Sequence, residues 1–310
     1  MNTFRTNIIR RLVFFGLLLL TLLTVSCGDS SGGGNGGGTA SQPRFVYLHF
    51  DQVTQKYVFH LSDGGSLDRT VGTPGFYGYA TLSPDGKYIA YINYAAGSTA
   101  EVYVLDVNSL VTTRVTYTGI RQNYNVQWLD NTKLLYRSYR TGNFGAQLFI
   151  SDLSGGNEQL LQTEYDICVH DPRVSPDGSR IIFYYHSVTS PHAIGSVNVL
   201  GTNYQTLNQL PGNAPAYSSD NAQFYYSDYS AATPQIAVAG LDGSNSKPLT
   251  SANSNYDPAP SGQQRVLYVQ TDSSGRSEIY SMKPDGSGKT QVTNTGGNSF
   301  AGAGASIITP

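Results

Sequence analysis

The sequence is poor in cysteine, in charge and in nearly every signal of a catalytic site. Its 310 residues include two cysteines and one tryptophan, and only 13% of them are charged. Two cysteines allow at most one disulfide, so stability has to come from a buried apolar core. Lysine and arginine number 19 against 21 acidic residues, and this balance lacks the basic excess of a nucleic-acid-binding protein. Nucleic acid is therefore not a predicted partner.

Motifs for enzymes and cofactors are equally scarce. Residues 43–310 contain no Gly-x-Ser-x-Gly nucleophile elbow. Cys168 and His170 by themselves are too little to define a zinc site, and the five histidines form no closely spaced ligand pair on one strand face. The sequence therefore predicts no catalytic residue, no metal and no cofactor.

Long hydrophobic runs are absent except near the amino terminus. Arg5, Arg10 and Arg11 precede a mainly apolar run at residues 12–25, which is shorter than the roughly 17 to 25 residues of a transmembrane helix. This pattern is typical of a signal peptide, and we expect one at residues 1–26. Its removal takes three of the 19 basic residues and leaves 16 against 21 acidic ones.

The end of this segment, Leu23-Thr24-Val25-Ser26-Cys27, resembles the bacterial lipobox, although Thr24 stands where leucine is usual. The resemblance implies that Cys27 is lipidated and that the lipid anchors the protein in a membrane. Gly28 in place of aspartate implies sorting to the outer membrane, on its periplasmic side. An ordinary signal peptide with an incidental cysteine is the alternative. Residues 27–42 then form the lipidated cysteine and a flexible Gly/Ser tether that spans roughly 20 Å.

What the rest of the chain does contain is a repeat. Ser83-Pro84-Asp85-Gly86 and Ser175-Pro176-Asp177-Gly178 each precede an apolar strand, and proline, aspartate and glycine at these places favour a tight turn. Six apolar-apolar-aromatic triplets follow one another at intervals of 42 to 47 residues. Their aromatic members are Tyr47, Tyr91, Tyr136, Phe183, Tyr226 and Tyr268.

Each triplet is followed by a second apolar segment and then by a short strand. The second segments are 57–61, 102–105, 148–150, 197–200, 236–238 and 279–282, and examples of the short strand are 114–116, 248–250 and 291–293. Four short strands in each of six units predict an all-β fold, a six-bladed β-propeller of four-stranded antiparallel blades over residues 43–310. The first unit lacks an initial strand, so we expect residues 301–307 to close the ring as its innermost strand.

At these residues the chain resembles the WD-repeat-like propeller repeats of the TolB family, and residues 172–183 (PRVSPDGSRIIF) match that pattern best. The resemblance implies the fold and an envelope binding or scaffold role rather than an enzyme. TolB itself has an amino-terminal α/β domain, where this chain has the Gly/Ser tether, so the Tol-Pal role of TolB is not implied.

Strand order places the loops between blades on one face of the propeller, opposite the Pro-Asp-Gly turns. We expect this face to bind an envelope protein, peptide or glycan, because aromatic residues and arginine are enriched at binding surfaces. The candidate residues are Tyr117, Arg121, Tyr124, Arg140, Phe144, Tyr165, His170, His186, Tyr229 and Tyr256.

Two alternatives remain open. Oligogalacturonate lyases resemble this architecture and hold a metal through histidine, so the first alternative is a carbohydrate-active lyase or hydrolase. It would use His170 and His186 with a carboxylate such as Asp166 or Asp171. The second alternative is a structural module without a discrete ligand.

Overall fold

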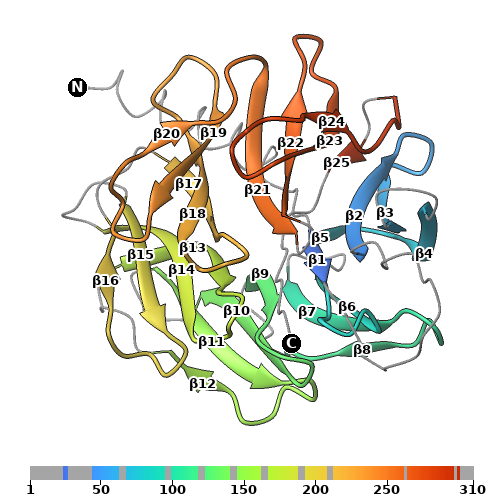
Figure 1. The fold of residues 1–310 in the computed structure, drawn as a ribbon. Coiled ribbons are helices and arrows are strands. Elements are labelled where there is room, and N and C mark those ends of the chain that lie inside the picture. Colours follow the sequence, from blue (N-terminus) through green and yellow to red (C-terminus); the bar gives the residue numbers. More distant parts are fainter. Residues whose placement is uncertain are drawn as a thin grey trace, which may run out of the picture.

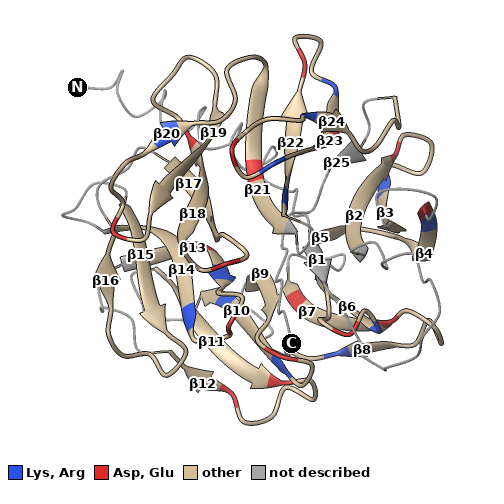
Figure 2. Ribbon diagram, in the orientation of Figure 1, with Lys and Arg blue, Asp and Glu red and all other residues tan. Residues whose placement is uncertain are grey.

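A computed structural model describes residues 24–26, 44–62, 68–94, 99–117, 123–139, 145–161, 167–187, 193–207, 212–261, 264–296 and 299–300. Six antiparallel sheets stand around a central axis, which confirms the predicted six-bladed β-propeller (Figure 1). Lys and Arg are interspersed with Asp and Glu around the ring (Figure 2). Within the described ranges, no helix is long and apolar enough to cross a membrane.

In blades two to six, four consecutive strands pair in chain order from the axis outward. Blade two comprises β5 (Tyr77–Leu82), β6 (Tyr88–Tyr94), β7 (Ala100–Asp106) and β8 (Thr112–Arg114). Blade three comprises β9 (Asn123–Trp128), β10 (Lys133–Tyr139), β11 (Ala146–Asp152) and β12 (Gln159–Leu160). Blade four comprises β13 (Ile167–Val174), β14 (Arg180–Ser187), β15 (Ala193–Asn198) and β16 (Gln205–Thr206). Blade five comprises β17 (Gly212–Tyr217), β18 (Gln223–Asp228), β19 (Gln235–Gly240) and β20 (Lys247–Pro248), and blade six β21 (Ser254–Ser261), β22 (Arg265–Thr271), β23 (Ser277–Met282) and β24 (Thr290–Gln291).

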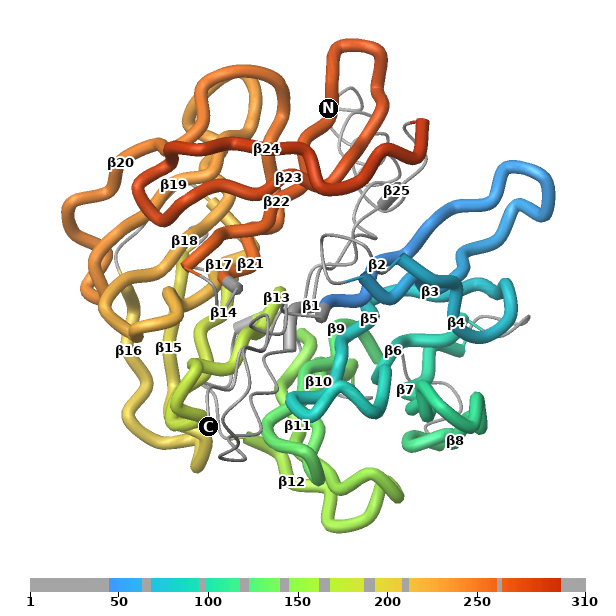
Figure 3. Tube along the Cα trace, turned by 45° about the vertical axis from the view of Figure 1, so that its right-hand side comes forward, coloured from blue at the N-terminus to red at the C-terminus, as the bar shows by residue number. Residues whose placement is uncertain are grey.

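Blade one closes the ring with segments from both ends of the chain. Its consecutive strands are β2 (Arg44–Asp51), β3 (Lys56–Ser62) and β4 (Asp68–Gly75). The inner edge of β2 pairs with β25 (Ser299–Phe300) and with β1 (Thr24–Ser26). After β24 the red end of the chain returns toward the blue first blade (Figure 3). Closure by the carboxyl-terminal part is thus seen at 299–300, whereas 301–307 lie outside the described residues. The sequence does not predict β1, because the same residues end the expected signal peptide.

The Pro-Asp-Gly segments form the turns between the first and second strands of a blade. In blade four, Ser175 Oγ donates to Asp177 Oδ1 at 2.6 Å and accepts the Arg180 N–H at 2.9 Å, while Gly178 has φ of 69°. Only glycine takes that backbone conformation without a steric cost. Equivalent side-chain bonds join Ser83 to Asp85 and Ser218 to Asp220. These aspartates are therefore turn residues, as predicted.

The aromatic triplets build the core between neighbouring blades. All six aromatic members are at most 3% exposed. Because side chains alternate along a strand, successive residues of β10 pack toward different neighbours: Leu134 and Tyr136 join a cluster with blade two, and Leu135 joins one with blade four. Each second strand therefore contributes apolar side chains to both faces of its blade.

Some strand boundaries differ from the prediction. The expected short strands end in Thr116, Thr250 and Thr293, but β8, β20 and β24 end two residues earlier. At each place the threonine Oγ1 accepts a backbone N–H of the third strand at 2.9 Å. A side-chain hydroxyl therefore takes the place of a backbone carbonyl as the acceptor. The expected segment at 197–200 is also displaced: β15 is Ala193–Asn198, and Leu200 is 82% exposed in the turn that follows.

The innermost strands share a β-bulge that the strand pattern did not lead us to expect. The pairing register of β5, β9, β13, β17 and β21 shifts once in each strand, next to a non-glycine residue with positive φ. These residues are Tyr79, Asn125, Asp171, Ala214 and Asp257, with φ between 46° and 54°. A bulge bends its strand and redirects its side chains. The five bulges therefore redirect side chains at equivalent positions of five innermost strands.

Candidate functional site

One end of the propeller gathers aromatic, basic and sulfur-containing side chains. It lies opposite the Pro-Asp-Gly turns, where the second strands of the blades end and the innermost strands begin. We call this end the loop face and define it by Tyr94, Tyr124, Arg137, Tyr139, Cys168, His170, His186, Tyr229 and Tyr256.

Arg137 is the centre of the best-defined cluster on the loop face. Its guanidinium carbon lies 5.1 Å from the ring centroid of Tyr124 and 5.2 Å from that of Tyr139. The two rings pack edge to face with centroids 5.8 Å apart. Arg137 Nη2 donates to Tyr139 Oη at 3.2 Å and to Cys168 Sγ of the next blade at 3.8 Å. Only 6% of Arg137 is exposed, so its charge is held by rings and sulfur rather than by water.

Cys168, His170 and His186 form the second cluster. Cys168 lies directly opposite His186 in the pairing of β13 with β14, and the rings of His170 and His186 have centroids 5.2 Å apart. One potential ligand atom from each of the three residues lies within 4.8 Å of the other two. The thiol is buried, whereas both histidines are partly exposed.

The electrostatics of this end favour uncharged rings. Burial, and then the positive charge of Arg137, lower the pKa of His186 below its ordinary value. Burial raises the pKa of Tyr139 to about 12, although Arg137 acts in the opposite direction. At neutral pH, His186 and Tyr139 are therefore both neutral, and Arg137 carries the charge of the cluster.

Below these clusters, the axis holds a buried ionic group. Arg173 is 1% exposed, and its pKa is lowered by burial while Asp171 and Asp257 act to raise it. Asn125 Nδ2 donates to Asp171 Oδ1 at 3.1 Å, which joins the bulges of blades three and four. Asp171 therefore has a hydrogen-bond partner on the neighbouring blade.

The structure brings together only part of the predicted site. Tyr124, His170 and His186 surround Arg137 and Cys168, whose roles the sequence did not indicate. Tyr229 is 41% exposed, and the charges of Asp257 and Asp171 raise its pKa further after the main effect of burial. Tyr117 is 73% exposed, and its ring centroid lies 4.5 Å from the guanidinium carbon of Arg114. Tyr256 is partly buried on the innermost strand of blade six, and the predicted residues that lie outside the described ranges are Arg121, Arg140, Phe144, Tyr165 and Asp166.

Two signals in the sequence point to the missed residues. Arg137 and Tyr139 are two positions apart on a predicted strand, so their side chains leave the same face of it. Cys168 and His170 have the same spacing. What the sequence lacks is the register that sets Cys168 opposite His186 and the packing that sets Arg137 against both.

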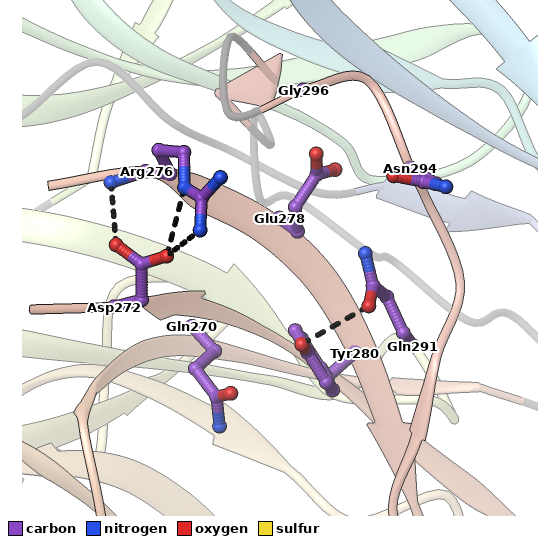
Figure 4. A pocket seen from close by; sticks show the side chains of 8 residues that line it. All are labelled: Gln270, Asp272, Arg276, Glu278, Tyr280, Gln291, Asn294 and Gly296. Carbon is purple, nitrogen blue, oxygen red and sulfur yellow. Dashed lines mark hydrogen bonds and ion pairs between the residues drawn. The ribbon is translucent and has the colours of Figure 1, made fainter. Parts of the chain in front are cut away.

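A separate cavity of about 230 Å³ lies in blade six (Figure 4). Asp272 and Arg276 form an ion pair at one side of it, with Nη2 and Oδ2 2.9 Å apart. Tyr280 Oη donates to Gln291 Oε1 at 3.2 Å on the other side. None of the predicted site residues lines this cavity; its walls are Gln270, Asp272, Arg276, Glu278, Tyr280, Gln291, Asn294 and Gly296.

Comparisons with known proteins identify the fold. No family model and no curated protein matches the chain. TolB from Acinetobacter baumannii is similar with a TM-score of 0.69 and 18% identity, and the match covers 83% of this chain but 65% of that structure. A protein assigned as TolB from Agrobacterium tumefaciens gives a TM-score of 0.61 and 20% identity, with 84% and 92% covered. A prolyl endopeptidase structure gives 0.54 and 15%, with 90% of this chain and 43% of that structure covered.

These likenesses agree with the arrangement of the blades. The chain spans about two thirds of the Acinetobacter TolB structure and less than half of the peptidase. At such identities the similarity defines architecture and leaves the activity to the residues of the site. In fold, the chain is a TolB-like six-bladed β-propeller.

Proposed function

We propose that this protein is an exported, lipid-anchored binding module of the cell envelope and that its loop face binds a protein, peptide or glycan partner. Lipidation of Cys27 would hold it at the outer membrane, facing the periplasm, and the Gly/Ser tether would let the propeller stand off the bilayer. The TolB-like fold supports a binding role.

The observation that carries the proposal is the Arg137 cluster. Tyrosine and arginine are among the residue types that contribute most to binding energy, because a rigid ring or a planar guanidinium buries a large area at little entropic cost. Here they are held in place before any partner arrives, since Arg137 is fixed between Tyr124 and Tyr139. A preorganised surface loses less entropy on binding.

Site-specific photo-crosslinking in the native envelope tests the proposal. A photoreactive residue at Tyr229, on the loop face, should give a discrete crosslinked product. The matched control is Leu200, which is more exposed but lies in a turn at the opposite end. The same product from both positions, or from neither, would refute a partner-binding loop face.

The double variant Tyr124→Ala/Tyr139→Ala tests the residues themselves. If the pair anchors the partner, its loss should cost at least about 2 kcal/mol, which lowers the affinity roughly 30-fold. Unfolding of the variant is monitored in parallel, so a stable variant with undiminished capture would show that the cluster is not the contact. Cleavage of a polysaccharide by the purified protein would instead support the carbohydrate-active alternative.

A further inference from the structure

The local geometry of blade four sets three metal-ligating side chains toward one point. Cys168 and His170 are two residues apart on β13, so they leave the strand on the same side. His186 is the direct cross-strand partner of Cys168 on β14. Side chains at such paired positions start only about 4.5 to 5.5 Å apart at Cβ. The three therefore share one face of a two-stranded ladder.

The spacing of the ligand atoms is close to that of a metal centre. The sulfur of Cys168 and one imidazole nitrogen from each histidine lie within 4.8 Å of one another. With bonds of about 2.3 Å to sulfur and about 2.0 Å to nitrogen, a tetrahedral zinc ion holds its ligand atoms roughly 3.3 to 3.5 Å apart. Side-chain rotation by about 1 Å closes the difference, and neither strand has to move.

Two side chains of blade three lie next to the sulfur of Cys168. Arg137 Nη2 lies 3.8 Å from Sγ, and Tyr139 Oη lies 3.4 Å from it. Arg137 repels a bound cation, but a cysteine binds a metal as its thiolate, which offsets one unit of that charge, and an anionic fourth ligand would offset another. The burial of Cys168 limits the competition of water for these contacts.

We propose that Cys168, His170 and His186 bind a zinc ion through one sulfur and two imidazole nitrogens, with the fourth coordination position open toward the loop face. Three protein ligands with an open position are the arrangement of zinc sites that take a further ligand, whereas purely structural sites have four. This site goes beyond the proposed binding role, which requires no metal. It also differs from the carbohydrate-lyase alternative, because the third ligand is a thiolate rather than a carboxylate.

The test uses the full chain with Cys27→Ser, so that Cys168 is the only thiol. Zn²⁺ should bind with one ion per chain, and Co²⁺ should give a thiolate-to-metal charge-transfer band with intense d–d bands of a tetrahedral site. Cys168→Ser should abolish the charge-transfer band. His170→Ala and His186→Ala should each lower the zinc affinity by more than the roughly 10- to 100-fold typical of outer-sphere partners.

Blade one supplies a matched control. His49 and His60 also lie close together, packed edge to face with centroids 5.4 Å apart, but no cysteine lies with them among the described residues. His49→Ala should leave zinc affinity unchanged. A second measurement needs no substitution of the three proposed ligands. If Cys168 binds the ion, Zn²⁺ should slow alkylation of its thiol. Absence of stoichiometric zinc, cobalt spectra without the thiolate band, or alkylation unaffected by Zn²⁺ would each overturn the site.

Discussion

Thr116 is a small side chain that connects two segments of blade two with the start of blade three. Its Oγ1 accepts the Val102 N–H at 2.9 Å and donates to the carboxylate of Glu101, which is 2% exposed. Asn123 Nδ2, from the start of the next blade, reaches the same Oγ1 at 3.2 Å and Glu101 Oε2 at 3.0 Å. The threonine therefore joins the third strand, the outermost strand and the following blade.

Thr116→Val keeps the shape of the side chain and removes the hydroxyl. The Val102 N–H then has no acceptor, and the Glu101 carboxylate loses one of its donors while Arg114 Nη2, at 3.0 Å, remains. A buried polar group left unsatisfied costs about 1 to 3 kcal/mol, so we expect a loss of roughly 3 kcal/mol in the free energy of unfolding. For a domain of this size, this corresponds to a decrease in Tm of roughly 6 to 12 °C.

Denaturant unfolding followed by tryptophan fluorescence measures the change, since Trp128 is the only tryptophan and is fully buried. Thr113→Val, on the exposed part of β8, is the control and should stay within about 0.5 kcal/mol of the parent. A Thr116→Val variant as stable as this control would refute the reasoning.

Blade five has the same threonine arrangement with a neutral acceptor, so it tests how much the charge of Glu101 contributes to the effect. There Thr250 Oγ1 accepts the Ile236 N–H at 2.9 Å and donates to Gln235 Oε1 at 2.7 Å, so the acceptor is a neutral amide instead of a carboxylate. Hydrogen bonds to charged groups contribute about 1 kcal/mol more than neutral ones. Thr250→Val should therefore destabilise the protein less than Thr116→Val.

Two further changes test close packing and the turns. Gly145→Ala would place a Cβ 2.7 Å from Cys168 Cβ and 2.8 Å from its Cα, and this overpacking should cost about 1 to 3 kcal/mol in denaturant unfolding. Burial alone would raise the pKa of Asp177, but hydrogen bonds from Ser175 and Ser179 outweigh it and lower that pKa. A lowered folded-state pKa means that stability is present above the unfolded value, about 3.9, and is lost as the pH falls through the folded one. Ser175→Ala should reduce this loss between neutral and acidic pH in unfolding titrations, and an unchanged pH profile would contradict that role.

The number of blades and most strands follow from the sequence because their causes are local. A Ser-Pro-Asp-Gly turn is stabilised by bonds between residues that lie within five positions of one another, as Ser175 and Arg180 show. The continuous apolar run Leu134-Leu135-Tyr136 indicates a strand that is buried on both faces. The aromatic triplet occurs six times at similar intervals, and such a repeat of short strands predicts a six-bladed propeller.

The bulges are only partly readable from the sequence. Asp171, Ala214 and Asp257 each precede a proline, and proline within a strand suggests an irregularity, since it cannot donate to the ladder. Tyr79 and Asn125 adopt the same backbone conformation without a following proline. No neighbouring residue in the sequence signals their positive φ.

The sequence by itself determined the turns, the strand-forming segments and the face on which the aromatic residues gather. Tertiary structure alone decided which of those residues meet. Arg137 and Cys168 are 31 positions apart, yet one blade packs its guanidinium against the thiol of the next. Cys168 and His186 meet through the register of a single hairpin, and shifting that register by one residue would separate them. Such contacts depend on packing between distant strands, which no local pattern specifies.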